Sequence, residues 1–285
     1  MRWDDRGTSS DVEDRRGQPG GGGGRIRVGL GGIVLLGVLS LVFQRNFFSL
    51  LDSPGTDGGA GGGGAPQAST DPGEEKLVHF VSFVLDDVQD VWNRELEALG
   101  RPYERAKLVL FTDGTRSGCG HAESAMGPFY CPADQKVYID LGFYRELRRR
   151  FGAPGDFAQA YVLAHEVGHH VQNQLGLERK LRTAQARNAG DAKALSVRFE
   201  LQADCLAGIW AHSTGQRNIL EAGDVEEALQ AAAAVGDDRI QKEATGRVNP
   251  ETWTHGSSRQ RMQWFNTGFR SGRLKDCDTL EVPAN

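Results

Sequence analysis

Two glycine-rich stretches, with an uncharged apolar run between them, restrict the part of the chain that can form a packed domain. Glycine makes up 38 of the 285 residues and is concentrated at residues 20–24 and 58–64. Such stretches bury too little apolar surface to offset the loss of chain entropy on folding. We therefore expect a disordered tail over residues 1–25, a glycine-rich linker over 49–73 and one folded domain over 74–285.

The run between these stretches, residues 28–43, reads VGLGGIVLLGVLSLVF and carries no charge. As a helix it would be about 24 Å long, slightly short of a bilayer core, but flanking arginines can extend to both surfaces. No small-x-small cleavage site follows it, so we expect an uncleaved transmembrane anchor over residues 26–48 that contacts the lipid bilayer. More arginines precede the run than follow it, which predicts a single-pass protein with a cytoplasmic N-terminus and an extracytoplasmic domain.

The four cysteines, Cys119, Cys131, Cys205 and Cys277, all follow the apolar run. An even number of cysteines in an oxidising compartment favours two disulfide bonds. Three pairings are possible, and the short loop favours Cys119 with Cys131, which leaves Cys205 with Cys277. Four buried free thiols are the alternative.

Hydrophobic periodicity over the folded domain predicts an α+β fold that is mostly helical, with a small β-sheet early in the domain. Residues 107–112 read as a strand, and alternating side chains predict a second strand at residues 136–141. Helices are expected at residues 76–99, 143–150, 157–175, 192–214, 222–243 and 257–270.

The motif H-E-x-x-H spans His165–His169 within a predicted helix that Asp156 can cap and Gly176 can end. Residues four apart lie on one helix face, so the imidazoles of His165 and His169 can share one zinc ion. Glu166 is offset by about 100° and can act on a water at that ion as the catalytic base. A surface helix with a chance arrangement of charges is the alternative.

A catalytic zinc needs a third protein ligand, and the next predicted helix offers Glu200 and Asp204 on one face. Apolar neighbours indicate that this helix is largely buried, where carboxylates are costly unless they meet a cation or hydrogen-bond donors. We expect Glu200 to be the third ligand and Asp204 to fix the tautomer of a ligand histidine.

The segment THGSSRQR near the C-terminus contains His255 and Arg259. Either side chain could stabilise an oxyanion close to the metal. The same segment also reads as a helix start capped by Ser257 or Ser258, and the two interpretations are compatible.

The stretches HEVGHHVQ, ELQADCLAG, THGSSRQR and WFNTGF resemble the bacterial neutral zinc metallopeptidase family, as do the opening MRWDDRGTSSDVEDRRG and the central GCGHAESAMGPFYCPADQKVYIDLGFY. H-E-x-x-H followed by E-x-x-A-D also resembles the gluzincins more broadly. The resemblance implies a zincin-like fold in which the sheet packs on the active-site helix and a second ligand helix. It implies one zinc ion on His165, His169 and Glu200, Glu166 as the base and Asp204 as support.

The resemblance further implies that a strand offers its edge to an extended substrate, although a purely structural strand is equally compatible with the sequence. The residues concerned are Lys136, Val137, Tyr138, Ile139 and Asp140.

We therefore expect a membrane-anchored zinc metallopeptidase of the bacterial cell envelope, of the metalloendopeptidase type, acting on a peptide or protein. The alternative is a membrane-tethered binding or scaffold protein with a structural zinc site, which would need four ligands and no base. A nucleic-acid partner is not expected, because the net charge is −5 and the arginines form no basic stripe.

Overall fold

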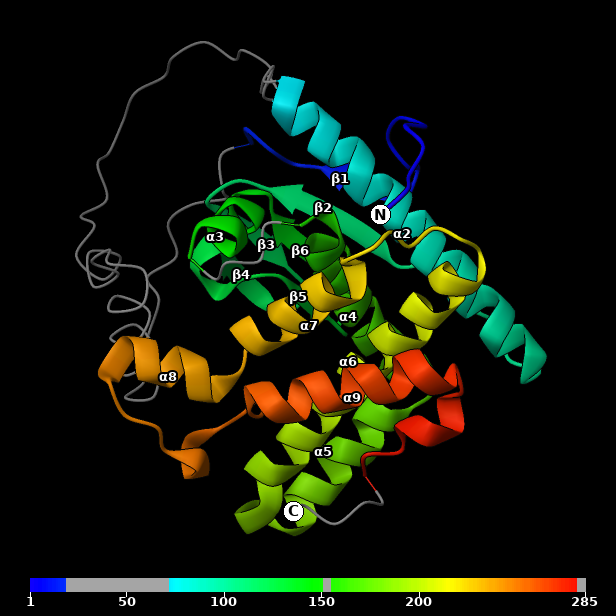
Figure 1. Ribbon diagram of the computed structural model, residues 1–285. Coiled ribbons are helices and arrows are strands. Elements are labelled where there is room, and N and C mark those ends of the chain that lie inside the picture. The colour runs from blue at the N-terminus through cyan, green and yellow to red at the C-terminus, as the bar shows by residue number, and fades with distance from the viewer. Residues whose placement is uncertain (19–71, 151–154, 281–285) are drawn as a thin grey trace.

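The computed structural model describes residues 1–18, 72–150 and 155–280. Helices surround a small sheet (Figure 1), so the fold is α+β and mostly helical, as predicted. The strands are β1 (Val12–Asp14), β2 (Lys107–Phe111), β3 (Gly114–Ser117), β4 (Gly120–Glu123), β5 (Phe129–Cys131) and β6 (Lys136–Asp140). The helices are α2 (Pro72–Ala98), α3 (Gly142–Arg150), α4 (Asp156–Gln174), α5 (Leu177–Arg187), α6 (Ala192–Gln216), α7 (Asp224–Ala234), α8 (Asp237–Thr245) and α9 (Ser258–Ser271), with a short 3₁₀ turn η5 (Leu274–Cys277).

The main sheet has the strand order β1-β2-β6-β5, in which β1, β2 and β6 are parallel and β5 is antiparallel to β6. Strands β3 and β4 form a separate hairpin. Strand β6 therefore lies inside the sheet, between β2 and β5. On the β5 side, Lys136–Tyr138 are paired with β5. The side-chain carboxylate of Asp140 is also engaged, because it accepts hydrogen bonds from the backbone N–H groups of Asp113 and Gly142.

The free edge expected on β6 is therefore covered over Lys136–Tyr138, while the substrate-binding role predicted for this strand stays a prediction. That prediction names Lys136, Val137, Tyr138, Ile139 and Asp140, all of which pair with β2 along the other side of the strand. The covering strand β5 was not foreseen because it has three residues and no clear alternation in its sequence.

The N-terminal segment joins the sheet. Strand β1 pairs in parallel with β2, and the Leu108 N–H donates to the carbonyl of Asp11 at 2.8 Å. The carboxylate of Asp11 accepts hydrogen bonds from Arg105 and Lys107. The disordered tail predicted for residues 1–25 is thus wrong for residues 1–18, because complementary charges and a strand edge compensate for the low apolar content of the segment.

Met1 extends this attachment to the helical layer. Its side chain is buried, and its ammonium group lies 2.7 Å from Asp156 and 3.2 Å from Asp224, at the starts of α4 and α7. Asp156 was expected to cap α4, but Gly155 occupies the cap position and the Asp156 carboxylate binds the ammonium group instead. Glu227 of α7 accepts the hydrogen bond from the Phe157 N–H in the first turn of α4.

The anchor predicted for residues 26–48 lies outside the described residues. Across the described ranges, no helix has the length and apolar character needed to cross a membrane. The pairing of β1 with β2 places residues 1–18 in one folded unit with residues 72–150 and 155–280, so all of them lie on the same side of any membrane. The predicted topology, with the N-terminus and the domain on opposite sides, is incompatible with this pairing.

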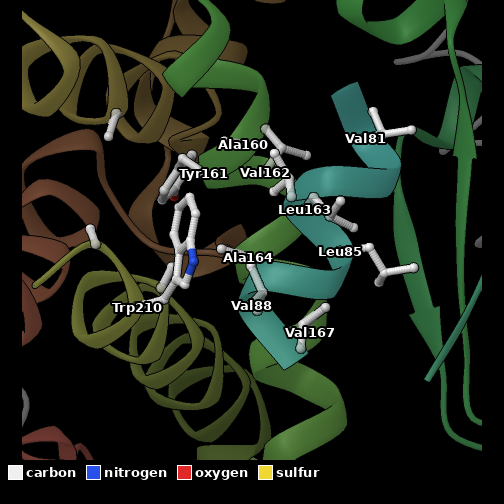
Figure 2. Packing of buried hydrophobic residues seen from close by; sticks show 14 of the residues in the cluster. Val81, Leu85, Val88, Ala160, Tyr161, Val162, Leu163, Ala164, Val167 and Trp210 are labelled. Atoms are coloured by element: carbon white, nitrogen blue, oxygen red, sulfur yellow. The ribbon is translucent and has the colours of Figure 1, made fainter. Parts of the chain in front are cut away.

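Helix α4 runs through the core. Figure 2 shows Val81, Leu85 and Val88 of α2 along one side of α4, and Trp210 of α6 on another side. Helices α4 and α9 both pack against α6 at glycine residues. A Cβ atom at Gly168 would lie 3.1 Å from the Ala203 carbonyl oxygen, and one at Gly208 would lie 2.1 Å from the Phe265 carbonyl oxygen. Small residues at these crossings let the backbones of α4, α6 and α9 approach closely.

The single helix predicted for residues 222–243 is two helices, α7 and α8. The chain is extended at Gly236, where a Cβ atom would lie 2.4 Å from the backbone nitrogen of Ser258. Ser258 at the start of α9 therefore leaves no room for a side chain at this break between the two helices. Ser257 caps α9 in a capping box with Gln260, as one of the two sequence interpretations expected.

Candidate metal centre

His165 and His169 of α4 and Glu200 of α6 come together with their metal-binding atoms facing one another. His165 Nε2 lies 3.3 Å from one Glu200 carboxylate oxygen, and His169 Nε2 lies 3.4 Å from the other. In a tetrahedral zinc site with bonds of about 2.0–2.1 Å, neighbouring ligand atoms lie about 3.3–3.4 Å apart. One donor atom from each of the three residues lies within 4.8 Å of the other two, so these predicted ligands could hold one zinc ion.

Asp204, the predicted support, accepts a hydrogen bond from His165 Nδ1 at 2.9 Å. It also accepts one from the hydroxyl of Tyr161 at 2.5 Å and two from the guanidinium of Arg261, both at 2.8 Å. Asp204 is fully buried and Arg261 nearly so. With the Nδ1 proton directed to Asp204, the lone pair of His165 is on Nε2, the atom that faces Glu200.

The charges in this cluster stabilise one another. Burial by itself raises the pKa of Asp204, but the Arg261 and His165 charges outweigh this effect and lower it to about 2. Burial lowers the pKa of His165, yet Asp204 and then Glu200 raise it to about 9. Burial also opposes ionisation of Glu200, but His169 and His165 hold its pKa well below the usual value. A site that already attracts positive charge this strongly is suited to a cation.

Glu166 follows His165 on α4 and is 8% exposed. Its carboxylate adds to the effect of burial in raising the pKa of the buried Tyr144. Unlike Glu200 and Asp204 of α6, Glu166 is neither a predicted metal ligand nor a hydrogen-bond partner of His165. Its role as the base stays a prediction.

His255 lies in the turn between α8 and α9. Its Nδ1 lies 3.2 Å from Asp237, whose carboxylate also accepts the backbone N–H groups of Thr254, His255 and Gly256 at 2.7–3.0 Å. Burial lowers the pKa of His255, but Asp237 and then Glu200 raise it above the usual value. The Glu200 carboxylate thus favours the protonated form of His255.

Arg259 is exposed on α9, whereas Arg261 is the arginine that enters the site. Sequence reasoning missed Arg261, although a signal was present. Arg261 lies four residues before Phe265 and seven before Gly268, which places it on the buried face of α9. Tyr161 was missed because a tyrosine in an apolar helix reads as a core residue.

Both disulfides that the sequence favoured are present in the structure. Cys119 is bonded to Cys131, and Cys205 of α6 is bonded to Cys277 of η5. The second bond holds the C-terminal turn against the helix that carries Glu200 and Asp204.

Comparison with protein families agrees with this geometry. The profile of a family described as "Putative neutral zinc metallopeptidase" matches residues 1–280. The chain belongs to this family. Membership supports a peptidase with a zinc cofactor, and the His165, His169 and Glu200 donors fit that ion. The match begins at residue 1, so the N-terminal strand lies within the region that defines the family.

Two curated relatives show how far the similarity extends. The chain is 49% identical over 290 residues to "Uncharacterized protein YpfJ" of Escherichia coli (strain K12), covering 98% of this chain and 99% of that protein. It is 48% identical over 208 residues to "Uncharacterized protein Rv2575" of Mycobacterium tuberculosis, covering 69% of this chain and 68% of that protein. No solved structure matches this neutral zinc metallopeptidase.

Proposed function

We propose that this protein is a zinc-dependent metalloendopeptidase in which Glu166 is the general base for hydrolysis of a peptide bond. One observation carries the proposal: His165 and His169 each place a nitrogen 3.3–3.4 Å from Glu200, the separation expected around one zinc ion. Among the described residues this metal-binding group has three members. A catalytic zinc takes three protein ligands and keeps one position for water, whereas a structural zinc takes four.

Zinc bound here would polarise the scissile carbonyl and lower the pKa of a bound water towards 7. Glu166 takes the proton from the attacking water and passes it to the leaving nitrogen. Its low exposure, 8%, limits competition from bulk water for that proton. His165 and Asp204 take no part in this proton transfer, because the hydrogen bond to Asp204 keeps the proton of His165 on Nδ1.

We assign stabilisation of the oxyanion to His255. Asp237 occupies Nδ1 of this histidine, so Nε2 is the nitrogen that can donate to a substrate. The His255 side chain is 51% exposed, which leaves it accessible. The exposed guanidinium of Arg259 is the alternative donor. A donor of this kind contributes about 10²–10³ in rate.

The test compares full-length wild-type protein with Glu166→Gln in a mild detergent. Zinc content is measured by mass spectrometry, and cleavage is measured on a proteome-derived peptide library. We expect about one zinc per chain in both proteins and internal cleavage by the wild type alone. His255→Ala should keep its zinc and lose about 10²–10³ in kcat/KM. Stoichiometric zinc with equal, background-level cleavage in wild type and Glu166→Gln would instead favour a structural zinc in a binding or scaffold protein.

We also propose that the protein works in the bacterial cell envelope, in an oxidising compartment. Two disulfides support this location, because such bonds persist outside the reducing cytosol. Association of residues 26–48 with the lipid bilayer stays a prediction. Any such association must leave residues 1–18, 72–150 and 155–280 on one side.

A further inference from the structure

A row of buried amide groups begins at Nδ1 of His169, the ring nitrogen that does not face Glu200. Gln172, one turn further along α4, is fully buried and accepts a hydrogen bond from His169 Nδ1 at 2.8 Å. The Gln172 Nε2 donates to the Phe199 carbonyl at 2.8 Å and to Gln202 Oε1 at 3.0 Å. Gln202 Nε2 in turn donates to the Cys277 carbonyl at 2.9 Å.

The two backbone carbonyls fix the direction of every hydrogen bond in this row. A carbonyl oxygen only accepts, so Gln202 must direct its NH₂ group to Cys277 and its Oε1 to Gln172. Gln172 must likewise direct its NH₂ group to Phe199 and Gln202, which leaves its Oε1 for the histidine. His169 therefore carries its proton on Nδ1 and its lone pair on Nε2, the atom 3.4 Å from Glu200.

The far end of the row is held by a covalent bond. Cys277 is buried and bonded to Cys205 of α6, with 5.6 Å between the two Cα atoms. The carbonyl that orients Gln202 therefore belongs to a residue attached to the second ligand helix. In contrast, His165 is oriented by the charged Asp204, so the two histidines depend on different kinds of support.

We propose that Gln172 and Gln202 are positioning residues that hold His169 in its metal-binding tautomer, and that the Cys205–Cys277 disulfide supports zinc affinity through them. The proposal rests on the proposed zinc site. It differs from a purely structural role, in which buried glutamines only satisfy one another, because it predicts that zinc affinity and fold stability respond to different substitutions.

The test measures the zinc affinity of the full-length protein by competition with a chromogenic chelator, and the thermal stability of the metal-free protein. Gln172→Met removes the acceptor, and we expect a loss of about 10–100-fold in zinc affinity. Gln172→Glu keeps an acceptor for His169 but places a carboxyl group against two other acceptors. Gln172→Glu should keep zinc affinity within about threefold of the wild-type value while lowering the melting temperature of the metal-free protein.

Two matched controls complete the test. Gln159 is another buried glutamine of α4, and its amide contacts the Gly155 carbonyl instead of a histidine. Gln159→Met should leave zinc affinity unchanged. Replacing both Cys205 and Cys277 by serine should weaken zinc binding by about 3–10-fold, towards the range seen on loss of such support. The same replacement of Cys119 and Cys131, which lie outside the row, should not.

The outcomes separate the two proposals. If the wild type holds no stoichiometric zinc, the proposed function fails and the positioning role fails with it. If the wild type binds zinc tightly and Gln172→Met binds it equally tightly, the positioning role is overturned and the proposed function stands. Equal losses in Gln172→Met and Gln159→Met would also overturn it, because general disturbance of α4 would then explain both.

Discussion

At the scale of single residues, the site depends on buried charges that compensate one another. Asp204 divides its two oxygens among His165, Tyr161 and Arg261. Removing charges from water is costly, and the attraction between them offsets that cost only when each is fully hydrogen-bonded. The loss of one partner therefore leaves an uncompensated charge next to a metal ligand.

Arg261→Met should lower the free energy of unfolding of the metal-free protein by about 3–5 kcal/mol, because Asp204 would remain buried without its cation. The measurement is urea unfolding in the presence of a chelator. Arg259→Met is the matched control on the same helix, and its exposed position predicts a change within about 0.5 kcal/mol. Equal effects of the two substitutions would refute the special role of Arg261.

At the scale of elements, strand β1 is attached by carboxylates as well as by backbone hydrogen bonds. Burial by itself raises the pKa of Asp11, but hydrogen bonds from Lys107 and Arg105 outweigh it and lower the pKa. The pKa of Glu13 is lowered in the same way by Lys136 and Arg15. A carboxyl group whose pKa is lower in the folded than in the unfolded protein stabilises the fold at pH values above its unfolded-state pKa. This stabilisation is lost as the pH falls through the folded-state pKa.

The N-terminal segment should therefore detach as the pH falls below the ordinary pKa values of Asp and Glu, about 3.9–4.3. Trp3, which packs on Phe80 and Phe83 of α2, reports on this segment. In protein labelled with fluorotryptophan, the ¹⁹F resonance of Trp3 should shift between about pH 4.5 and pH 3, before that of the buried Trp210. A Trp3 signal that moves only together with Trp210 would show that β1 does not detach separately.

Helices α6 and α9 form another element-scale feature, because their backbones meet at two glycines. A Cβ atom at Gly268 would lie 1.9 Å from the Cys205 carbonyl oxygen, close to the Gly208 contact described above. The crossing sets the distance between Arg261 on α9 and Asp204 on α6. A methyl group here would separate the two helices.

Gly208→Ala should therefore destabilise the protein by at least about 1–3 kcal/mol through overpacking, measured by urea unfolding. Gly215 lies on the same helix and offers a control, since its Cβ atom would lie an ordinary 3.4 Å from Leu220. Gly215→Ala should be neutral, or stabilising by up to about 1 kcal/mol, because alanine favours the helix. Similar losses at both positions would contradict the close-crossing explanation.

At the scale of the whole molecule, residues 18 and 72 belong to one folded unit. Residue 18 follows β1, and residue 72 begins α2. Figure 1 shows β1 in the same sheet as β2 and beside α2. The sidedness of the N-terminal segment is thus tied to that of the metal centre.

Single cysteines at exposed Asp4 and exposed Arg187 test this sidedness. A membrane-impermeant maleimide applied to intact cells should label Asp4→Cys and Arg187→Cys to the same extent, because both lie on one folded unit. Detergent-permeabilised cells provide the reference for complete labelling. Labelling of one position alone would show that residues 1–18 and the helical layer lie on opposite sides.

The parts of the fold that the sequence predicted are those with strong local periodicity. Helix α4, strand β2 and the H-E-x-x-H spacing depend on residues close in the chain, so local pattern determines them. The carboxylates of Glu200 and Asp204 were predictable as well, because burial of charge on an apolar helix demands a partner. The N-terminal strand β1 was not, since three residues carry too little pattern.

By itself, the sequence determined which residue types are available for zinc and that His165 and His169 share one face of a helix, because a 3.6-residue repeat fixes that relation. Only the tertiary structure decided that Glu200 faces both histidines, that Arg261 and not Arg259 meets Asp204, and that residues 1–18 complete the sheet. These outcomes depend on how α4, α6 and α9 cross and on which strand edges are free. Such relations join residues far apart in the chain, so local pattern cannot specify them.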